Sequence, residues 1–204
     1  MEPLNPYPFP DGVDVPRLMP FQEYPWNNDH HLAAEVLRLK EAHGLKYAYE
    51  TGTCLGSTAL WLAEHFERVH TYEIYEPTWT IALARIPKSF PRSITAHLKH
   101  SATGLRAHST HDAFYFLDAH WGDHCPLLEE LDALVGRSNI AIVIHDFHVP
   151  GTTFGFDRMP NGTPFNLDLI RLHLDAIYGV DGWQHNYPSA VAGAERGWIS
   201  IEPT

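Results

Sequence analysis

The sequence predicts an α/β protein in which a mostly parallel sheet is covered by helices on both faces. Two observations lead to this prediction. Segments typical of strands alternate with segments typical of helices along the 204 residues, as in parallel sheets built from β-α-β units. The segment NIAIVIHDF, residues 139–147, is a run rich in β-branched residues, as expected for a strand that is buried on both faces.

The chain divides into an arm and one domain. Residues 1–26 form a proline-rich N-terminal arm, which we expect to be extended because proline fixes φ and removes a backbone donor. Its aromatic side chains indicate that it packs, either across its own domain or as a lid or dimer strap. Residues 27–204 are expected to form a single domain. This domain begins with a helix that Asn28 or Asp29 caps and that ends near residue 43, before Gly44.

The other elements follow from periodicity and from glycine and proline punctuation. A closing antiparallel pair is expected at residues 182–188 and 197–203. Predicted strands span residues 46–51, 68–74, 93–98, 112–121 and 139–147, and predicted helices span residues 57–66, 78–86, 125–136 and 166–179.

Composition narrows the classes of partner and compartment. The net charge of −11 argues against broad nucleic-acid binding and against binding to an anionic membrane. No apolar run is long enough to span a bilayer, and prolines stand where a signal peptide would have its apolar core. The two cysteines, Cys54 and Cys125, have no metal-type spacing and favour a reducing compartment. We therefore expect a cytoplasmic protein.

A glycine-containing loop, YETGTCLGST at residues 49–58, follows the first strand of the predicted sheet. A dinucleotide-binding loop needs glycine at three positions. Counting from Gly52, those positions hold Gly52, Cys54 and Ser57, so two of the three lack glycine. The spacing that is present is E-x-G-x-x-x-G, directly before a helix.

Two acidic residues suggest what this loop binds. Glu50 opens the spacing and would place a carboxylate beside an anion-binding turn, where it repels phosphate. Glu73 ends the next predicted strand, the position from which an acid accepts hydrogen bonds from two ribose hydroxyls. The pair favours an adenosine cofactor with a cationic, amino-acid-like tail, as in S-adenosylmethionine. The alternative is a turn that only packs helix on strand, with Glu73 in solvent.

Residues 47–151 resemble class I S-adenosylmethionine-dependent methyltransferases, and residues 116–151 are similar to the catechol O-methyltransferase group. The shared features are an aspartate before His-Trp at the end of the fourth strand, LLEE in the next helix and a polar pair shortly before Pro-Gly. The resemblance implies a Rossmann-like three-layer sandwich with a mostly parallel seven-stranded sheet and an antiparallel C-terminal strand. It also implies transfer of a methyl group to an oxygen of a small molecule. The implied cofactor-binding residues are Glu50, Gly52, Thr53, Gly56, Ser57, Glu73, Ser101, Ala102 and Asp118.

In that family a divalent cation is held by an aspartate of the fourth strand and an Asp-Asn pair of the fifth. Carried over through the Pro-Gly anchor, these positions are Asp118, His145 and Asp146. Histidine replaces one oxygen ligand, and whereas Mg²⁺ prefers oxygen, imidazole also admits Mn²⁺ and heavier ions. We expect Mg²⁺ or Mn²⁺, with the identity open. Alternatively, His145 binds a backbone carbonyl and Asp146 caps a turn, since side chains alternate along a strand.

The lysine base of the family is absent, because the chain reads HWGD at residues 120–123. His120, Asp123, His124 or His148 would take its role, and Asp118, His120 and His148 are the candidate catalytic residues.

Two other functions fit the same residues: a metal-dependent hydroxylase or hydrolase, and a non-catalytic module that binds the cofactor. The expected partner is a small-molecule acceptor, and a homodimer through the arm or the sheet edge is an open alternative.

Overall fold

The computed structural model describes residues 23–86, 93–108, 110–120 and 124–204. Residues 1–22 of the predicted arm lie outside this set, as do Trp121 and Asp123. Within the described ranges, none of the helices is long and apolar enough to cross a bilayer.

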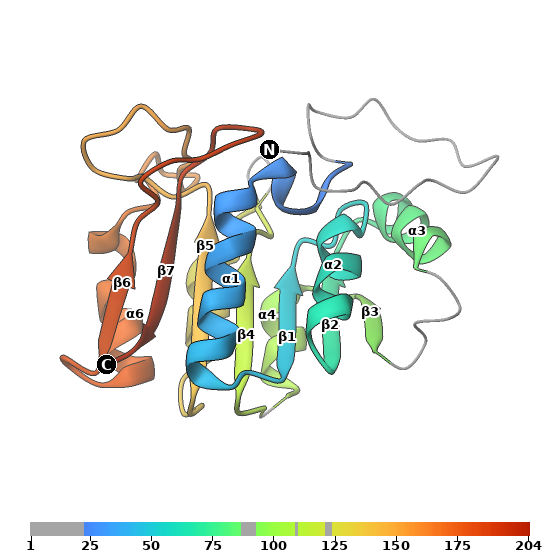
Figure 1. Cartoon of the computed structure of the whole chain (residues 1–204), viewed down its shortest axis with the longest axis horizontal. Helices are drawn as coiled ribbons and strands as arrows, with labels where there is room; N and C mark the ends of the chain where they lie inside the picture. The colour runs from blue at the N-terminus through green and yellow to red at the C-terminus, as the bar shows by residue number, and fades with distance from the viewer. Residues whose placement is uncertain (1–22, 87–92, 109, 121–123) are drawn as a thin grey trace.

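One seven-stranded sheet runs through the molecule in the order β3-β2-β1-β4-β5-β7-β6 (Figure 1). The first five strands are parallel, and β7 is antiparallel to both of its neighbours, β5 and β6. This confirms the predicted sheet. The strands are β1 (Tyr47–Thr51), β2 (Arg68–Glu73), β3 (Ile94–Leu98), β4 (Ala113–Leu117), β5 (Ile140–His145), β6 (Trp183–Asn186) and β7 (Trp198–Pro203).

The helices lie where the apolar periodicity predicts them, with two additions: α4 and the 3₁₀ helix η1, which begins in the arm expected to be extended. The helix α1 is capped by the Asp29 side chain and ends at Gly44, which has φ +62°, so the predicted caps are confirmed. The sequence did not predict the six-residue helix α4. The helices are η1 (Pro25–Asn28, 3₁₀), α1 (His30–His43), α2 (Ser57–His65), α3 (Glu76–Arg85), α4 (Ser101–Arg106), α5 (Leu127–Asp132) and α6 (Leu167–Tyr178).

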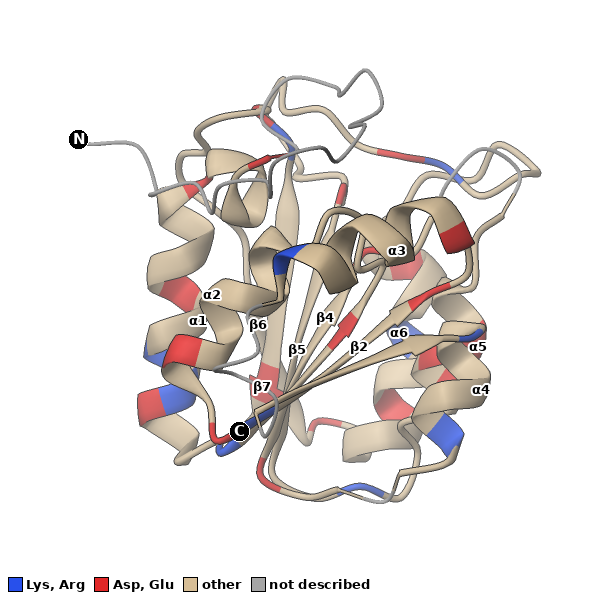
Figure 2. Ribbon diagram, turned by 90° about the vertical axis from the view of Figure 1, so that its right-hand side faces the viewer, with Lys and Arg blue, Asp and Glu red and all other residues tan. Residues whose placement is uncertain are grey.

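Two apolar cores lie on opposite faces of the sheet. Figure 2 shows α1 and α2 on one side and α4, α5 and α6 on the other. Alternate residues of β4 divide between these layers, since Phe114 and Phe116 pack toward α1 and α2 whereas Tyr115 and Leu117 pack toward the opposite helices. All residues of β4 and β5 are buried, as the continuous apolar runs predict.

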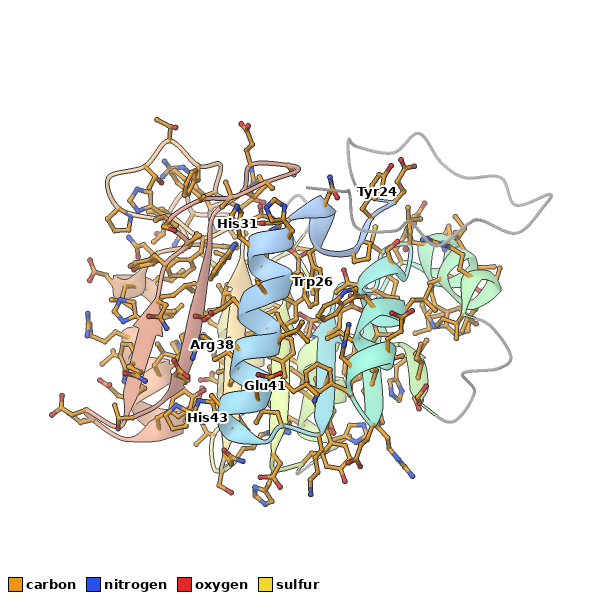
Figure 3. The ribbon with its side chains drawn as sticks, in the orientation of Figure 1. Tyr24, Trp26, His31, Arg38, Glu41 and His43 are labelled. Atoms are coloured by element: carbon orange, nitrogen blue, oxygen red, sulfur yellow. The ribbon has the colours of Figure 1, made fainter. Side chains whose placement is uncertain are left out.

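The segment that precedes α1 is part of the first core. The side chain of Trp26 is 1% exposed and packs edge-on against Trp61 and Phe116, with ring centroids 5.1 Å and 4.9 Å away. Figure 3 shows Trp26 beneath η1, and Arg38 and His43 on α1. Both of these basic residues bind Glu202 of β7, which fixes α1 across the sheet.

Candidate cofactor and metal site

The carboxyl ends of β1, β4 and β5 lie at the upper edge of the sheet in Figure 1, and the predicted site residues gather there. The loop after β1 turns sharply at Gly52, which has φ +81°. A Cβ atom at this position would lie 2.6 Å from the backbone oxygen of Asp118. Gly56 also has positive φ, and its Cβ would lie 3.2 Å from that of Ala82 in α3. The two glycines are therefore required by close contacts within the protein itself.

Glu50 lies beneath this loop and is 1% exposed. Its Oε2 accepts a 2.6 Å hydrogen bond from the Thr71 hydroxyl, which in turn lies 2.5 Å from the Thr53 hydroxyl. Burial raises the pKa of Glu50 to about 8, against an ordinary value of 4.5. The sequence argument treated Glu50 as a carboxylate, but at neutral pH the buried group is mainly a neutral acid until a cation approaches it.

Glu73 lies at the end of β2, next to the glycine loop. Its Oε2 accepts a hydrogen bond from the backbone of Cys54 at 3.0 Å, and its Oε1 accepts bonds from the backbones of Ile74 and Tyr75, each at 2.9 Å. These bonds fix the orientation of the carboxylate. A half-buried, oriented acid at this position is suited to bind a ribose.

Three other predicted cofactor residues bind protein groups. The Ser57 hydroxyl donates to the backbone of Glu23 and accepts from Arg85 at 2.9 Å. The Ser101 hydroxyl donates to Glu130, and Ala102 is fully buried at the start of α4. The side chains of these residues are thus engaged in packing, which leaves their backbone groups as the contacts they offer a ligand.

The three predicted metal ligands converge. The Nδ1 of His145 lies 3.3 Å from Oδ1 of Asp118 and 3.4 Å from Oδ2 of Asp146. Their ligand atoms all lie within 4.8 Å of one another. Because β5 ends at His145 and Asp146 has φ +54°, the chain reverses the usual alternation of a strand. This left-handed residue, uncommon outside glycine, turns the Asp146 carboxylate back toward the imidazole.

The structure adds residues that the sequence analysis missed. His120 Nε2 lies 2.9 Å from Oδ2 of Asp146 and 3.1 Å from Oδ2 of Asp157. Arg196, which precedes β7, pairs with both of these carboxylates. Asp157 and Arg196 come from irregular segments, so neither periodicity nor motif spacing could have identified them.

These contacts determine the charge of the cluster. Burial opposes the protonated form of His120, but its hydrogen bonds to Asp146 and Asp157 prevail and raise its pKa to about 10. The pKa of His145 is also raised, because the charges of Asp146 and Asp118 outweigh its burial. Both imidazoles are therefore held toward their protonated forms, and the predicted role of His120 as a base requires it to lose this proton.

The donor set fits a divalent transition ion. The Nδ1 of His145 is buried and has no hydrogen-bond partner among the described residues, although two carboxylate oxygens lie near it. Two oxygens and one nitrogen at these separations suit Mn²⁺ or Fe²⁺ better than Mg²⁺. The guanidinium of Arg196 and the protons on the imidazoles place positive charge beside these carboxylates. A bound metal ion would take over that role.

Two of the other candidate bases, His148 and His124, belong to none of the metal-type groups among the described residues. The His148 ring packs edge-on against Phe156 at 4.8 Å, and the His124 ring packs against His100 at 5.3 Å. The fourth candidate, Asp123, lies outside the described residues.

Glu130 is a further residue that the sequence analysis read only as part of a helix. It is buried, and burial raises its pKa to about 7. Together with Ala119, His120 and Phe165 it lines a narrow hollow. Its hydrogen bond with Ser101 connects α5 to the start of α4.

No protein-family model and no curated protein sequence matches the chain, but solved structures share its fold. The O-methyltransferase TomG from Streptomyces achromogenes, solved with S-adenosylmethionine, is 16% identical, with a TM-score of 0.60 over 85% of this chain and 77% of that chain. An O-methyltransferase from Bacillus cereus, solved with S-adenosylhomocysteine, is 17% identical, with a TM-score of 0.59 over 94% and 84%. Precorrin 8W decarboxylase from Methanobacterium thermoautotrophicum is 12% identical, with a TM-score of 0.58 over 100% of both chains.

The chain therefore has the Rossmann-like fold of the class I S-adenosylmethionine-dependent methyltransferases, which confirms the predicted fold class. The decarboxylase among these structures illustrates that such a fold does not determine the reaction. The activity must be argued from the site.

Proposed function

We propose that the protein is an S-adenosylmethionine-dependent methyltransferase that acts on an oxygen of a small molecule with the help of a divalent metal ion. The observation that carries this proposal is the position of Asp118. Its backbone oxygen touches the glycine loop at Gly52, and its carboxylate belongs to the metal-type cluster. A methyl donor over the loop and an acceptor at the cluster would therefore be neighbours.

Each residue then has a defined task. Glu73 would hold the ribose, and Glu50 would ionise beneath the cationic end of the cofactor. Asp118, His145 and Asp146 would hold the metal ion. When bound, the metal would supply Lewis acidity toward an acceptor hydroxyl and the cofactor would supply the methyl group. The protein's own contribution would be positioning, which can lower a barrier by about 7–11 kcal/mol in favourable cases.

The decisive experiment measures cofactor binding and turnover together. Titration calorimetry with S-adenosylmethionine, with and without Mn²⁺, should show binding, whereas a nicotinamide dinucleotide should not bind. A radiolabelled methyl donor and a panel of hydroxylated acceptors, including catechols, then test transfer. Asp118→Asn should lower turnover by about 100-fold or more while the protein stays folded. Wild-type turnover in this variant would overturn the proposal.

A matched control comes from the same layer of the fold. Asp132 is an exposed carboxylate of α5 that pairs with His173 at 2.7 Å, so Asp132→Asn removes an equal charge away from the site. It should leave turnover unchanged.

One observation favours a second candidate function. His120 and His145 both approach Oδ2 of Asp146, at 2.9 Å and 3.4 Å. Two imidazoles and one carboxylate are the ligand count of non-haem iron oxygenases, and here the two imidazoles belong to separate metal-type groups that share Asp146. Stoichiometric iron in the purified protein, combined with no affinity for S-adenosylmethionine, would favour a metal-dependent hydroxylase over the methyltransferase.

A further inference from the structure

Three histidines form a second cluster on the face of the sheet that carries α4. His70 lies in β2, His97 lies in the edge strand β3, and His108 follows the end of α4. Nδ1 of His70 lies 3.1 Å from Nε2 of His97. The three imidazoles offer nitrogen atoms within 4.8 Å of one another. No other His, Cys, Asp or Glu in the described residues belongs to this group.

The rings are held in place by their neighbours. The His70 ring stacks on Tyr49 at 5.1 Å, and the His97 ring stacks on Tyr72 at 4.8 Å. The His108 ring lies over His70, with centroids 4.5 Å apart. The helix α4, which ends two residues before His108, sits close to the sheet, because a Cβ atom at Gly104 would lie 2.2 Å from the Tyr72 ring. The cluster is therefore preorganised.

We propose that His70, His97 and His108 form a binding site for a divalent transition ion of the Zn²⁺ type, with a fourth position open to water. Two ligands at about 2.0–2.1 Å from a tetrahedral ion are about 3.3 Å apart, close to the 3.1 Å between His70 and His97. All three side chains are half-buried, so an ion can reach them from solvent.

The surroundings select the type of ion. This cluster contains no carboxylate, and the positive charges of Arg68 and Lys99 act on it. An ion that depends on charge and oxygen ligands, such as Mg²⁺ or Ca²⁺, is disfavoured there. An ion that binds imidazole nitrogens well, such as Zn²⁺, is not disfavoured there. Nδ1 of His70 and Nε2 of His97 lie at hydrogen-bond distance from each other, so a bound ion would replace a contact that needs a proton on one of these two nitrogens.

The site lies away from the cofactor region and would have a structural role. The carboxyl-end cluster uses Asp118 and the end of β5, whereas the three histidines lie on β2, on β3 and just after α4. A bound ion would fasten α4 to the edge strand of the sheet. Because Ser101 begins the same helix, the ion would also steady one border of the proposed cofactor site.

The test uses the full chain, stripped with a chelator, in the Asp146→Asn background, because Asp146 belongs to both of the other metal-type groups among the described residues. Calorimetric titration with Zn²⁺, and visible spectroscopy with Co²⁺, should show one site with tetrahedral absorption. Adding His97→Gln should weaken binding by about 100-fold or more, since even the loss of a group that supports a ligand costs 10–100-fold. Zn²⁺ should raise the Tm only when the histidine is present.

His185→Gln is the matched control, since His185 is a half-buried strand histidine whose pKa is lowered by burial, like that of His97. It should leave Zn²⁺ binding unchanged. If His97→Gln does not fold, His108→Gln at the helix end replaces it. The proposal would be overturned if the protein with all three histidines does not bind Zn²⁺. It would also be overturned if the protein with the histidine substitution binds Zn²⁺ equally well.

Discussion

A single buried carboxyl shows how the environment of a residue determines its charge. From the sequence, Glu50 was expected to place a carboxylate beside the glycine loop, and the structure encloses it beneath that loop with Thr71 as its hydrogen-bond donor. The consequence is a group whose pKa is raised to about 8. It can be neutral in the free protein and ionised beside a cation, so its charge follows the occupancy of the site.

Glu50→Gln should stabilise the protein increasingly as the pH rises. In the unfolded chain the carboxyl ionises near its ordinary pKa of 4.5, whereas in the folded protein it ionises near 8. Between these values the folded state binds more protons than the unfolded state, so the wild-type protein loses stability as pH increases. Glutamine removes this loss, with a gain on the order of 1–3 kcal/mol at pH 8.

Urea unfolding of the wild type and of Glu50→Gln at pH 5 and pH 8 measures the gain in the free energy of unfolding. The control Glu41→Gln, at an exposed position of α1, should show no gain that depends on pH. A difference that is constant with pH would show that the buried group does not titrate as the geometry requires.

At the residue scale, the sequence identified part of the site. Asp118, His145 and Asp146 were identified through the resemblance to the catechol O-methyltransferase group, with the Pro-Gly pair as the anchor. Their convergence depends on the left-handed backbone of Asp146, which no pattern encodes. Asp157 and Arg196 are brought to the site by irregular segments.

At the scale of elements, the contact between the glycine loop and β4 determines the shape of the site. Gly52 is pressed against the carbonyl that follows β4. The apolar and glycine patterns predicted both elements, but only the assembled sheet shows that they touch. The short helix α4 was not predicted, because its six residues are too few to show the apolar periodicity of a helix.

Gly52→Ala should lower the free energy of unfolding by about 2–4 kcal/mol, because an unfavourable φ adds to a clash with backbone atoms. Gly136→Ala is the matched control, since Gly136 has a similar φ of +84° but faces open space. It should cost only about 1–2 kcal/mol. Chemical denaturation of both variants measures the two costs. If both variants lose the same free energy of unfolding, the close approach of Gly52 to Asp118 makes no contribution to stability.

At the scale of the whole molecule, segments distant in sequence meet at one edge of the sheet. The alternation of strands and helices predicted the architecture because each apolar face needs a partner layer. It did not predict that Arg196, from the connection into β7, would pair with Asp146 after β5 and with Asp157. This cation balances carboxylates that would otherwise repel one another.

Arg196→Gln should raise the affinity for Mn²⁺, on the order of tenfold, because one competing positive charge is removed from the carboxylates. Arg158→Gln changes an arginine that instead binds the backbone of Gly162, and it should leave the affinity unchanged. Calorimetric titration with Mn²⁺ compares the two variants with the wild type. Weaker binding in Arg196→Gln would show that the guanidinium supports the ligands rather than competing for them.

The contact between Gly52 and the carbonyl of Asp118 has a consequence for protein engineering. Because one backbone contact joins the glycine loop to Asp118, a proposed ligand of the metal ion, a change to either part would disturb the other. A loop grafted from another scaffold would have to bring the end of its partner strand with it, so the two segments form the smallest transplantable module of this fold.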